Sequence, residues 1–513
     1  MASLIRHYQY RIKTEAQVAC NRNRYYQHSI TIMASAFASF HSSNSTTNAH
    51  HVSRHIRFQN IIATNRTIKA KYANDDDTDY TNLVEFKVHQ LIPTMAALLK
   101  SCNQLQKISV NRSLSSHVAS VISKIPSLRE LDIADDVSQF SHLQLTKLSG
   151  LLPIGKIDAM NGFSNLATLA VEIVDKFKVW HYTNVFDPTL PKLLHLTLTS
   201  QLPCLINLSK YPTLMVLKCK MSNLISLEDL LHLIDLEYCE LDNDNSNLTT
   251  LVPFANLERL KALVLSNVPV LSLQPLQHLM LSTLMLTLNS DNTTPVNLDR
   301  INSDHLVHLL LNTGTPFTTQ VEEAHTLARF TNLDTFSYNN QLTTRSLITM
   351  NKLTKLYLHQ SSHISLDSLN GIQHLTNLNT LHVSNCDVDD ESLVYCKYLP
   401  LEHLEFIDTQ VQSLTHLSGL IELKTLKINT ARVFDHIDEL KPLTKLQHLT
   451  LDSKITHTFT SAHYHQWYIT KAVHVDHPIV QVLQRMTNLE DCLLYHRTKY
   501  QSRMKTYKLV YEN

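Results

Sequence analysis

One stretch of the chain nearly matches a loop that binds nucleotide phosphates. Gly150 is followed five positions later by Gly155 and then by Lys156, a spacing at which backbone N–H groups and a lysine surround phosphates. The hydroxyl that should hold Mg²⁺ is missing, because Ile157 occupies its position. Pro153 also removes a backbone donor from the loop. We therefore interpret the stretch as a loop between structural units and expect no cofactor.

Histidines near the C-terminus have spacings that suit a transition metal. One residue separates His463 from His465, and two separate His474 from His477. Imidazoles at such spacings can bind Zn²⁺ or Cu²⁺. The whole chain is rich in His, with 30 residues, and carries no strict Cys/His zinc pattern. Structural or solvated histidines are the simpler interpretation, and we predict no metal site.

An acidic run is the remaining group of residues that could do chemistry. Asp389, Asp390 and Glu391 are consecutive, and carboxylates are favoured at the first turn of a helix because of its dipole. We expect them to cap a helical turn. No Ser/His/Asp or Cys/His pair can be placed in space from the sequence, so we predict no catalytic residues and no enzyme activity.

The elements that position these residues are built from a sequence motif that recurs along the chain and is called here the phrase. It consists of an apolar residue, two variable residues, an apolar residue, one variable residue and an apolar residue. It reads Leu353-x-x-Leu356-x-Leu358 in one unit, and there are seventeen copies, most of them 19 to 27 residues apart. The end of the phrase alternates with period two, as a strand does. Stacking many copies in parallel buries the apolar positions in one continuous core. The copies begin at Leu83, Leu105, Leu128, Leu166, Leu193, Leu214, Leu233, Leu260, Leu281, Leu306, Leu333, Leu353, Leu378, Leu401, Leu423, Leu446 and Leu489.

The phrase resembles that of the leucine-rich-repeat family over roughly residues 83–495. The resemblance implies an α/β solenoid of about 17 repeats, a curved horseshoe with a parallel sheet on the concave side and helices or turns on the convex side. The family's usual Asn or Cys near the ninth position occurs here as Asn289 and Cys386, and Thr409 fills it in another unit. The units mix features of the short 22-residue and the cysteine-containing subclasses, which leaves the subclass open.

Three segments follow from the positions of the copies. Residues 1–80 precede the array as a basic tail or targeting segment, and residues 81–495 form the solenoid. Two steps are long, 38 and 43 residues, and predict insertions near 134–165 and 454–478. Residues 496–513 are expected to form a C-terminal cap.

Charge divides the chain at about residue 74. Residues 1–74 hold ten Lys or Arg and one acid, whereas the remainder holds 35 bases and 44 acids. Three interpretations of the basic segment stay open: a disordered tail, an organelle transit peptide, or a secretory signal with its apolar part at 30–40. Met33 could also be the true start. The opposite charges allow a further hypothesis, in which the tail folds back on the acidic solenoid and competes with a ligand.

Composition narrows the function and the location. The six Gly disfavour most nucleotide-binding folds, which need glycine at sharp turns. The eight Cys form no tight cluster of the kind that caps secreted leucine-rich proteins, so we expect free thiols and a cytoplasmic location, with organelle targeting as the alternative. The sequence contains no run of about twenty apolar residues, so we predict no membrane-spanning helix. The acidic body predicts no nucleic-acid partner, and the oligomeric state stays open.

The third and fifth positions of each phrase are predicted to point to the concave side, where a partner would bind. In the middle units the fifth positions are apolar, and in the C-terminal half both columns are polar, which suits a protein or peptide partner. We therefore predict a non-catalytic interaction scaffold. The alternatives are the substrate-recognition subunit of an F-box-type ubiquitin ligase and a regulatory subunit of a phosphatase or GTPase. The predicted contact residues are Val264, Met285, Leu310, Lys355, Tyr357, His382, His403, Glu405, Lys427 and His448.

Overall fold

A computed structural model gives the fold of the chain. It describes residues 69–72, 83–99, 101–175, 184–200, 204–221, 227–243, 250–268, 272–288, 297–312, 325–339, 344–359, 369–386, 388–411, 413–430, 437–453 and 491–496. The chain divides into two compact units, one of residues 1–108 and 115–127 and the other of residues 109–114 and 128–513.

The smaller unit begins with an antiparallel pair of strands. It contains β1 (Lys69–Tyr72), β2 (Leu83–Val88), α4 (Pro93–Leu99) and α5 (Ser116–Ile122), and β3 (Lys107–Val110) crosses its boundary. β1 pairs with β2 in antiparallel register. Residues 69–72, which the sequence analysis assigned to the tail, therefore extend the sheet by one strand. The rest of the segment 1–80 lies outside the described residues.

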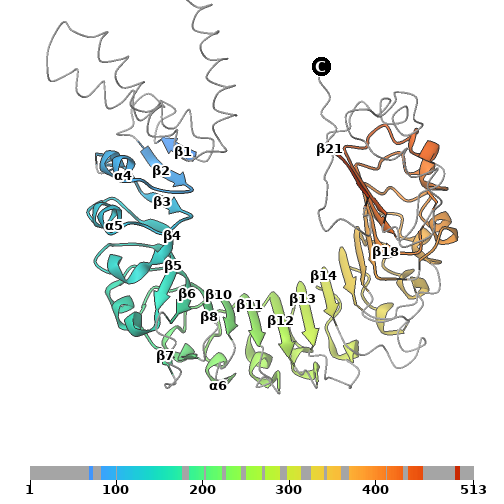
Figure 1. The fold of residues 1–513 in the computed structure, drawn as a ribbon. Helices are drawn as coiled ribbons and strands as arrows, with labels where there is room; N and C mark the ends of the chain where they lie inside the picture. The colour runs from blue at the N-terminus through green and yellow to red at the C-terminus, as the bar shows by residue number, and fades with distance from the viewer. Residues whose placement is uncertain are drawn as a thin grey trace, which may run out of the picture. The chain divides into compact units, whose positions relative to one another are not determined.

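The larger unit is built on a parallel sheet. Within the described residues, sixteen strands of the main sheet lie wholly in this unit, and every pair among them is parallel. They follow one another in chain order (Figure 1). The strands are β4 (Glu130–Asp136), β5 (Lys147–Pro153), β6 (Thr168–Val174), β8 (His195–Ser200), β10 (Val216–Met221), β11 (Tyr238–Asn243), β12 (Ala262–Val268), β13 (Thr283–Leu288), β14 (His308–Asn312), β15 (Thr335–Tyr338), β16 (Lys355–His359), β17 (Thr380–Ser384), β18 (His403–Thr409), β19 (Thr425–Thr430), β20 (His448–Ser453) and β21 (Asp491–His496). β7 (Asn184–Phe186) and β9 (Cys204–Ile206) form a separate parallel pair.

The apolar positions of the phrase form the core, as the sequence analysis predicts. In the β16 unit the side chains of Leu353, Leu356 and Leu358 are at most 2% exposed. Leu356 pairs with Leu381 of β17, so equivalent leucines stack from strand to strand. Burying one leucine fully contributes about 1.5–3 kcal/mol. No single unit could stabilise itself, but a continuous stack of such leucines holds the solenoid together.

Short helical turns return the chain from one strand to the next. Figure 1 shows that these turns lie along one side of the row of strands. Most are 3₁₀ turns, closed by bonds such as Leu420 N–H to the Leu417 carbonyl at 2.9 Å. The described turns of this unit are η2 (Val137–Phe140), η3 (Ile154–Gly162), η4 (Leu208–Lys210), α6 (Leu227–Leu230), η5 (Val252–Asn256), η6 (Gln274–Leu276), η7 (Leu298–Arg300), η8 (Thr344–Leu347), η9 (Ile372–His374), η10 (Glu391–Tyr395), η11 (Leu417–Gly419) and η12 (Ile437–Leu440). No helix within the described ranges has the length and apolar character that crossing a membrane requires.

The segment 134–165, predicted as an insertion, contains a regular repeat instead. Strand β5 pairs with β6 in regular register and with β4 with a register shift after Asp132, and its phrase reads Leu145-x-x-Leu148-x-Gly150. The third apolar position is a glycine, which is why the pattern was missed. A Cβ at Gly150 would lie 2.6 Å from both the Ile133 carbonyl oxygen and Cγ1 of Val137. The crowded position therefore requires glycine.

Two further details of the sequence pattern are corrected or limited by the structure. The copy placed at Leu233 begins three residues later, because Cys239 and not Leu236 pairs with Leu217 of β10. Of the ninth-position residues, Cys386 and Thr409 are buried, and Cys386 donates to the Ser384 carbonyl at 3.2 Å. The predictions for Asn289, for the insertion at 454–478 and for the cap at 496–513 lie outside the described residues.

Candidate functional site

One face of the parallel sheet carries the variable positions of the phrases and is called here the outward face. The fifth positions form a continuous row across the strands, since each pairs with the next from β12 to β19. In order, the row is Val264, Met285, Leu310, Ser337, Tyr357, His382, Glu405 and Lys427. The third positions form a second row of Lys355, Thr380, His403, Thr425 and His448. The ten predicted contact residues therefore lie together on this face.

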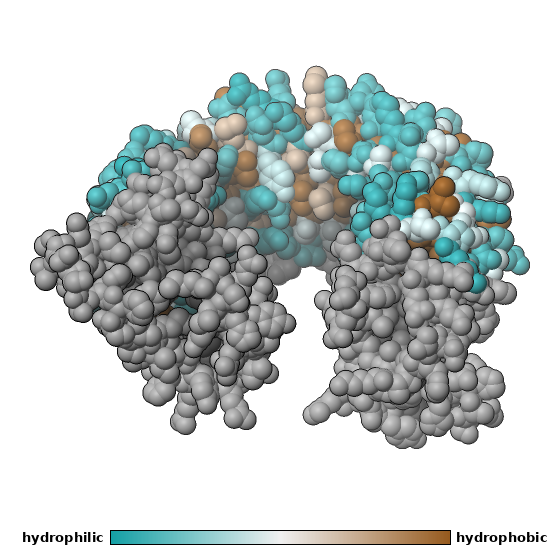
Figure 2. Space-filling model, turned by 90° about the horizontal axis from the view of Figure 1, so that it is seen from above, coloured by the Kyte–Doolittle hydropathy of each residue, from teal (hydrophilic) through white to brown (hydrophobic). Residues whose placement is uncertain are grey.

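The middle of the first row is apolar. Val264, Met285 and Leu310 lie on the adjacent strands β12, β13 and β14, and all three are half-buried. We call these three residues the apolar stripe. In the part of the described surface seen in Figure 2, hydrophobic side chains lie between larger hydrophilic areas. An apolar group bordered by polar ones is the usual anatomy of a protein-binding surface.

Beyond the stripe, strands β16 to β18 bring together a group that we call the histidine cluster: Tyr357, His359, His382, Ser384 and Glu405. Nδ1 of His382 lies 2.8 Å from Oε2 of Glu405, and Nδ1 of His359 lies 2.6 Å from Oγ of Ser384. The two imidazole rings are 4.9 Å apart between centroids, and the Tyr357 ring is 6.1 Å from that of His382. The cluster is a connected polar surface.

The environment of the cluster shifts two ionisation equilibria. The hydrogen bond with His382 and the nearby charge of Lys427, whose Nζ lies 3.8 Å from Glu405, hold the pKa of Glu405 below its usual value despite partial burial. Burial, and next the charge of His382, lower the pKa of His359 below 6.5. Glu405 is therefore ionised and His359 neutral near pH 7.

The cluster contains the side-chain types of a hydrolase but not their arrangement. A Ser–His–acid triad needs one imidazole that contacts both the hydroxyl and the carboxylate. Here Ser384 is partnered by His359, whereas Glu405 is partnered by His382. Among the described residues, no three His, Cys, Asp or Glu side chains form a group that could hold a metal ion. The geometry suits recognition by hydrogen bonds.

A second charged group on the same face was missed by the sequence analysis. On β10 and β11, the Glu240 carboxylate lies 3.3 Å from Lys218 Nζ and 3.6 Å from Lys220 Nζ, and it accepts a 3.0 Å hydrogen bond from Tyr238. Lys218 also lies 4.6 Å from the centre of the Tyr238 ring. Burial and the bond to Glu240 raise the pKa of Tyr238 to about 12. The predicted columns began with the Leu260 copy, so Lys218 and Glu240 of the two preceding copies were not among the predicted residues.

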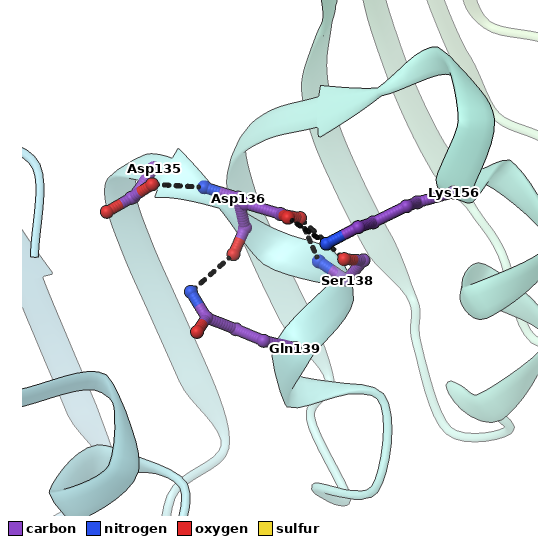
Figure 3. Close-up of polar contacts among 5 residues, drawn as sticks. All are labelled: Asp135, Asp136, Ser138, Gln139 and Lys156. Atoms are coloured by element: carbon purple, nitrogen blue, oxygen red, sulfur yellow. Dashed lines mark hydrogen bonds and ion pairs between the residues drawn. The ribbon is translucent and has the colours of Figure 1, made fainter. Parts of the chain in front are cut away.

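The stretch that resembles a phosphate-binding loop is not a loop between repeats, as its interpretation had it: residues 150–153 belong to strand β5, and residues 154–157 begin the turn η3 that follows. Figure 3 shows Lys156 pointing at the carboxylate of Asp136, with the atoms 2.7 Å apart. The same carboxylate accepts bonds from the backbone N–H and the hydroxyl of Ser138, at 2.9 and 2.6 Å. Gln139 donates to the Asp136 carbonyl at 2.8 Å. The lysine is thus occupied in fixing the turn η2 after β4.

The acidic run near residue 390 serves the same kind of purpose. Asp389 accepts bonds from the backbone N–H and the hydroxyl of Ser392, at 3.0 and 2.7 Å, and so caps the turn η10 as predicted. Asp390 accepts from the backbone N–H of Ser413 in the next unit at 2.7 Å. The C-terminal histidines considered as metal ligands, His463, His465, His474 and His477, lie outside the described residues.

Comparison with known proteins adds similarity of fold. No family model and no curated protein matches the chain. Among solved structures, an internalin of Listeria monocytogenes is 17% identical, over 79% of this chain and 84% of that one, with a TM-score of 0.34. A leucine-rich-repeat protein of Leptospira interrogans is also 17% identical, over 72% of this chain and 88% of that one, with a TM-score of 0.38.

A third similar structure is the leucine-rich-repeat ectodomain of the Arabidopsis thaliana receptor kinase GASSHO1/SCHENGEN3, in complex with CASPARIAN STRIP INTEGRITY FACTOR 2. It is 17% identical, over 72% of this chain and 47% of that one, with a TM-score of 0.37. The recurring leucine phrase and the parallel register of its strands by themselves make the fold of the chain a solenoid of leucine-rich repeats.

Proposed function

We propose that this protein is a non-catalytic scaffold that binds a protein partner on the outward face of its larger unit, between β12 and β19. The observation that carries the proposal is the row of fifth positions, in which the apolar stripe is followed, after Ser337, by the histidine cluster. A solenoid offers many equivalent positions of this kind, and their side chains decide what binds.

The two parts of the row supply complementary contributions to binding. Burying the apolar stripe under a partner would remove apolar surface from water and would stabilise the complex by about 25 cal/mol for each Å² buried. The histidine cluster and the neighbouring lysines offer directional donors, which favour one partner over another. Tyr357 is the member of the histidine cluster nearest to the apolar stripe along the row, and it is of the residue type that often contributes most to an interface.

The proposal includes a cytoplasmic location. The support for it is that the cysteines whose side chains the structure describes are buried thiols: Cys102, Cys219, Cys239, Cys386 and Cys396. No feature of the described residues favours the F-box or the phosphatase and GTPase alternatives over a general scaffold.

Site-specific photocrosslinking tests the proposed face. A benzophenone amino acid placed at Met285 or at Tyr357 in the full chain should crosslink a discrete protein in cells. The same group at Val394, an exposed residue of the turn η10, should not. Crosslinks from Val394 alone, or an equal pattern from all three positions, would contradict the proposed face.

A charge in the apolar stripe provides a second test. Met285→Asp should prevent a benzophenone amino acid at Tyr357 from capturing the partner. The circular-dichroism spectrum should stay unchanged, because Met285 is only half-buried and lies outside the leucine core. Thr283→Asp, on the same strand in the third position, is the matched control for charge. Capture that survives Met285→Asp, or a collapsed fold, would show that the stripe has been misassigned.

A further inference from the structure

The two imidazole rings of the histidine cluster lie against each other, and their polar partners differ. The ring centroids of His359 and His382 are 4.9 Å apart. Nδ1 of His382 lies 2.8 Å from a carboxylate oxygen of Glu405, so a positive charge on this ring would lie beside an opposite charge. Nδ1 of His359 lies 2.6 Å from the hydroxyl of Ser384, which carries no charge. Within the described cluster, a proton on His359 would therefore have no carboxylate as its hydrogen-bond partner.

The described strands on either side of His359 bring no carboxylate to its ring. On one side, β15 presents the uncharged Thr335 and Ser337 on the outward face. On the other side, β17 presents His382, whose charge disfavours a second proton. The other titratable groups of the outward face close to the ring pair are Lys355 and Tyr357 on β16, His403 and Glu405 on β18, and Lys427 on β19.

Acid must therefore change the cluster at His359. Burial, and next the charge of His382, hold the pKa of His359 below 6.5. When His359 does take up a proton, two cationic rings lie with their centres 4.9 Å apart and repel each other. Protonation also makes both ring nitrogens of His359 donors, so the hydroxyl of Ser384 can then only accept. The closed arrangement of the cluster is thus favoured by the neutral ring.

A partner seated on the outward face would oppose this uptake of a proton. Covering the cluster removes water from an imidazole that is already half-buried, and burial disfavours its charged form. Binding and protonation are therefore linked, and each must weaken the other. For a single proton, the affinity for the partner falls by at most about tenfold for each pH unit below the midpoint of the ring.

Resting on the proposed function, we propose that the histidine cluster makes binding of the protein partner sensitive to acid, and that protonation of His359 releases the partner. The partner binds while His359 is neutral, near pH 7 and above, and is released as the pH falls below about 6.5. Its contact with the ring is apolar or a hydrogen bond to the neutral imidazole. A partner carboxylate at this place would favour the charged ring and reverse the sign of the effect.

Uptake of the proton can be followed without the partner, by NMR of the full chain labelled at the histidine Cε1 atoms. The signal of His359 is the one that His359→Gln lacks, and its midpoint should lie below pH 6.5. In His382→Gln the neighbouring charge is lost, so the midpoint of His359 should rise by about half a pH unit. A midpoint at or above pH 6.5, or one that His382→Gln leaves unchanged, would overturn the inference.

Release of the partner is measured by photocrosslinking at two pH values. The chain carrying the benzophenone amino acid at Met285, three strands from His359, is incubated with cell lysate at pH 7.5 or 5.0. The crosslink yield should fall about fivefold at the lower pH. In His359→Gln the same ratio should change less than twofold, whatever the yield of this variant at pH 7.5. His195→Gln is the matched control, since this exposed histidine of β8 lies outside the proposed surface, and should keep the full fall.

The outcomes separate this inference from the proposed function. A crosslink at pH 7.5 that persists unchanged at pH 5.0 would support the face and overturn the acid release. The same fall in His359→Gln as in the unaltered chain would assign the acid sensitivity to another group and also overturn the inference. A yield that rises at pH 5.0 would mean that the partner brings a carboxylate to the ring, against the chemistry inferred here. No crosslink at either pH would contradict the proposed function itself, and the inference with it.

Discussion

Asp136 and Glu405 are two ion-paired carboxylates of the larger unit, and they serve different purposes. Both have a pKa held below the usual value by hydrogen bonds and a nearby lysine, against the effect of burial. Asp136 accepts from the backbone of its own turn and sits beside a sequence that resembles a nucleotide loop. Glu405 accepts from His382, a side chain of the preceding strand, on the outward face.

The difference shows where a repeat protein keeps structure and where it can keep function. Contacts to backbone groups at the end of a strand hold one repeat on the next, so the residues there are constrained by folding. Side chains at the variable positions of the strands are constrained by nothing in the core. The motif that looked chemical is therefore structural, and the candidate site lies among residues that carry no motif.

The largest expected effect belongs to the structural region. Gly150→Ala places a methyl group 2.6 Å from the Ile133 carbonyl oxygen and from Val137, at a φ of +155° that side chains rarely adopt. We expect a loss of stability on the order of 3 kcal/mol, measured by urea denaturation. Gly155→Ala is the matched control, because nothing lies within 4 Å of its new methyl group. Equal effects at the two glycines would contradict the crowding described at Gly150.

The second effect separates the cap from the ion pair at Asp136. Asp136→Ala removes the acceptor for the Ser138 backbone N–H and should cost about 1–2 kcal/mol of stability. Asp136→Asn keeps an acceptor and loses only the charge opposite the exposed Lys156, so its cost should be well below half of that. Neither change should reduce the crosslink from a benzophenone amino acid at Tyr357, and a loss of that crosslink in Asp136→Asn would contradict the difference in purpose between Asp136 and Glu405.

These residues also show how far the sequence could lead. The leucine phrase predicted the solenoid, the parallel strands and the outward rows, because burial repeats with the period of the fold. The phrase did not reveal the β5 repeat, because the third apolar position is occupied by Gly150. A larger side chain there would clash with Val137. The phrase also placed one copy at Leu233, since leucines three apart fit the phrase in two registers.

The polar part of the candidate site was only half predictable. The columns gave Tyr357, His382 and Glu405 as neighbours, because strand spacing is fixed. They did not give His359 and Ser384, which lie at the seventh position, beyond the phrase itself. Pairing within the cluster depends on side-chain rotamers, which no periodicity specifies. A column analysis extended by two positions would have found both residues.

A smaller effect should appear in the pH dependence of stability. Burial and then His382 lower the pKa of His359 below 6.5, so the unfolded chain binds more protons as the pH falls below about 6.5. The contribution of neutral His359 is therefore present above that pH and is lost as the pH falls through the folded-state pKa. His359→Gln can keep a hydrogen bond with Ser384 but cannot titrate. Between pH 7.5 and 5.5 its urea midpoint should fall less than that of the unaltered protein.

The smallest change in stability, and the sharpest contrast with Asp136, is expected at Glu405. Glu405→Gln keeps an acceptor for His382 and buries no new charge, so stability should stay within about 0.5 kcal/mol. The substitution removes a negative charge that lies between His382 and Lys427 on the outward face. The yield of the crosslink from a benzophenone amino acid at Tyr357 should therefore change, because the charge lies within the proposed contact surface. Asp136→Asn removes the same charge away from that surface and should leave the yield unchanged. Equal yields in the two variants would contradict the assignment of recognition to this part of the outward face.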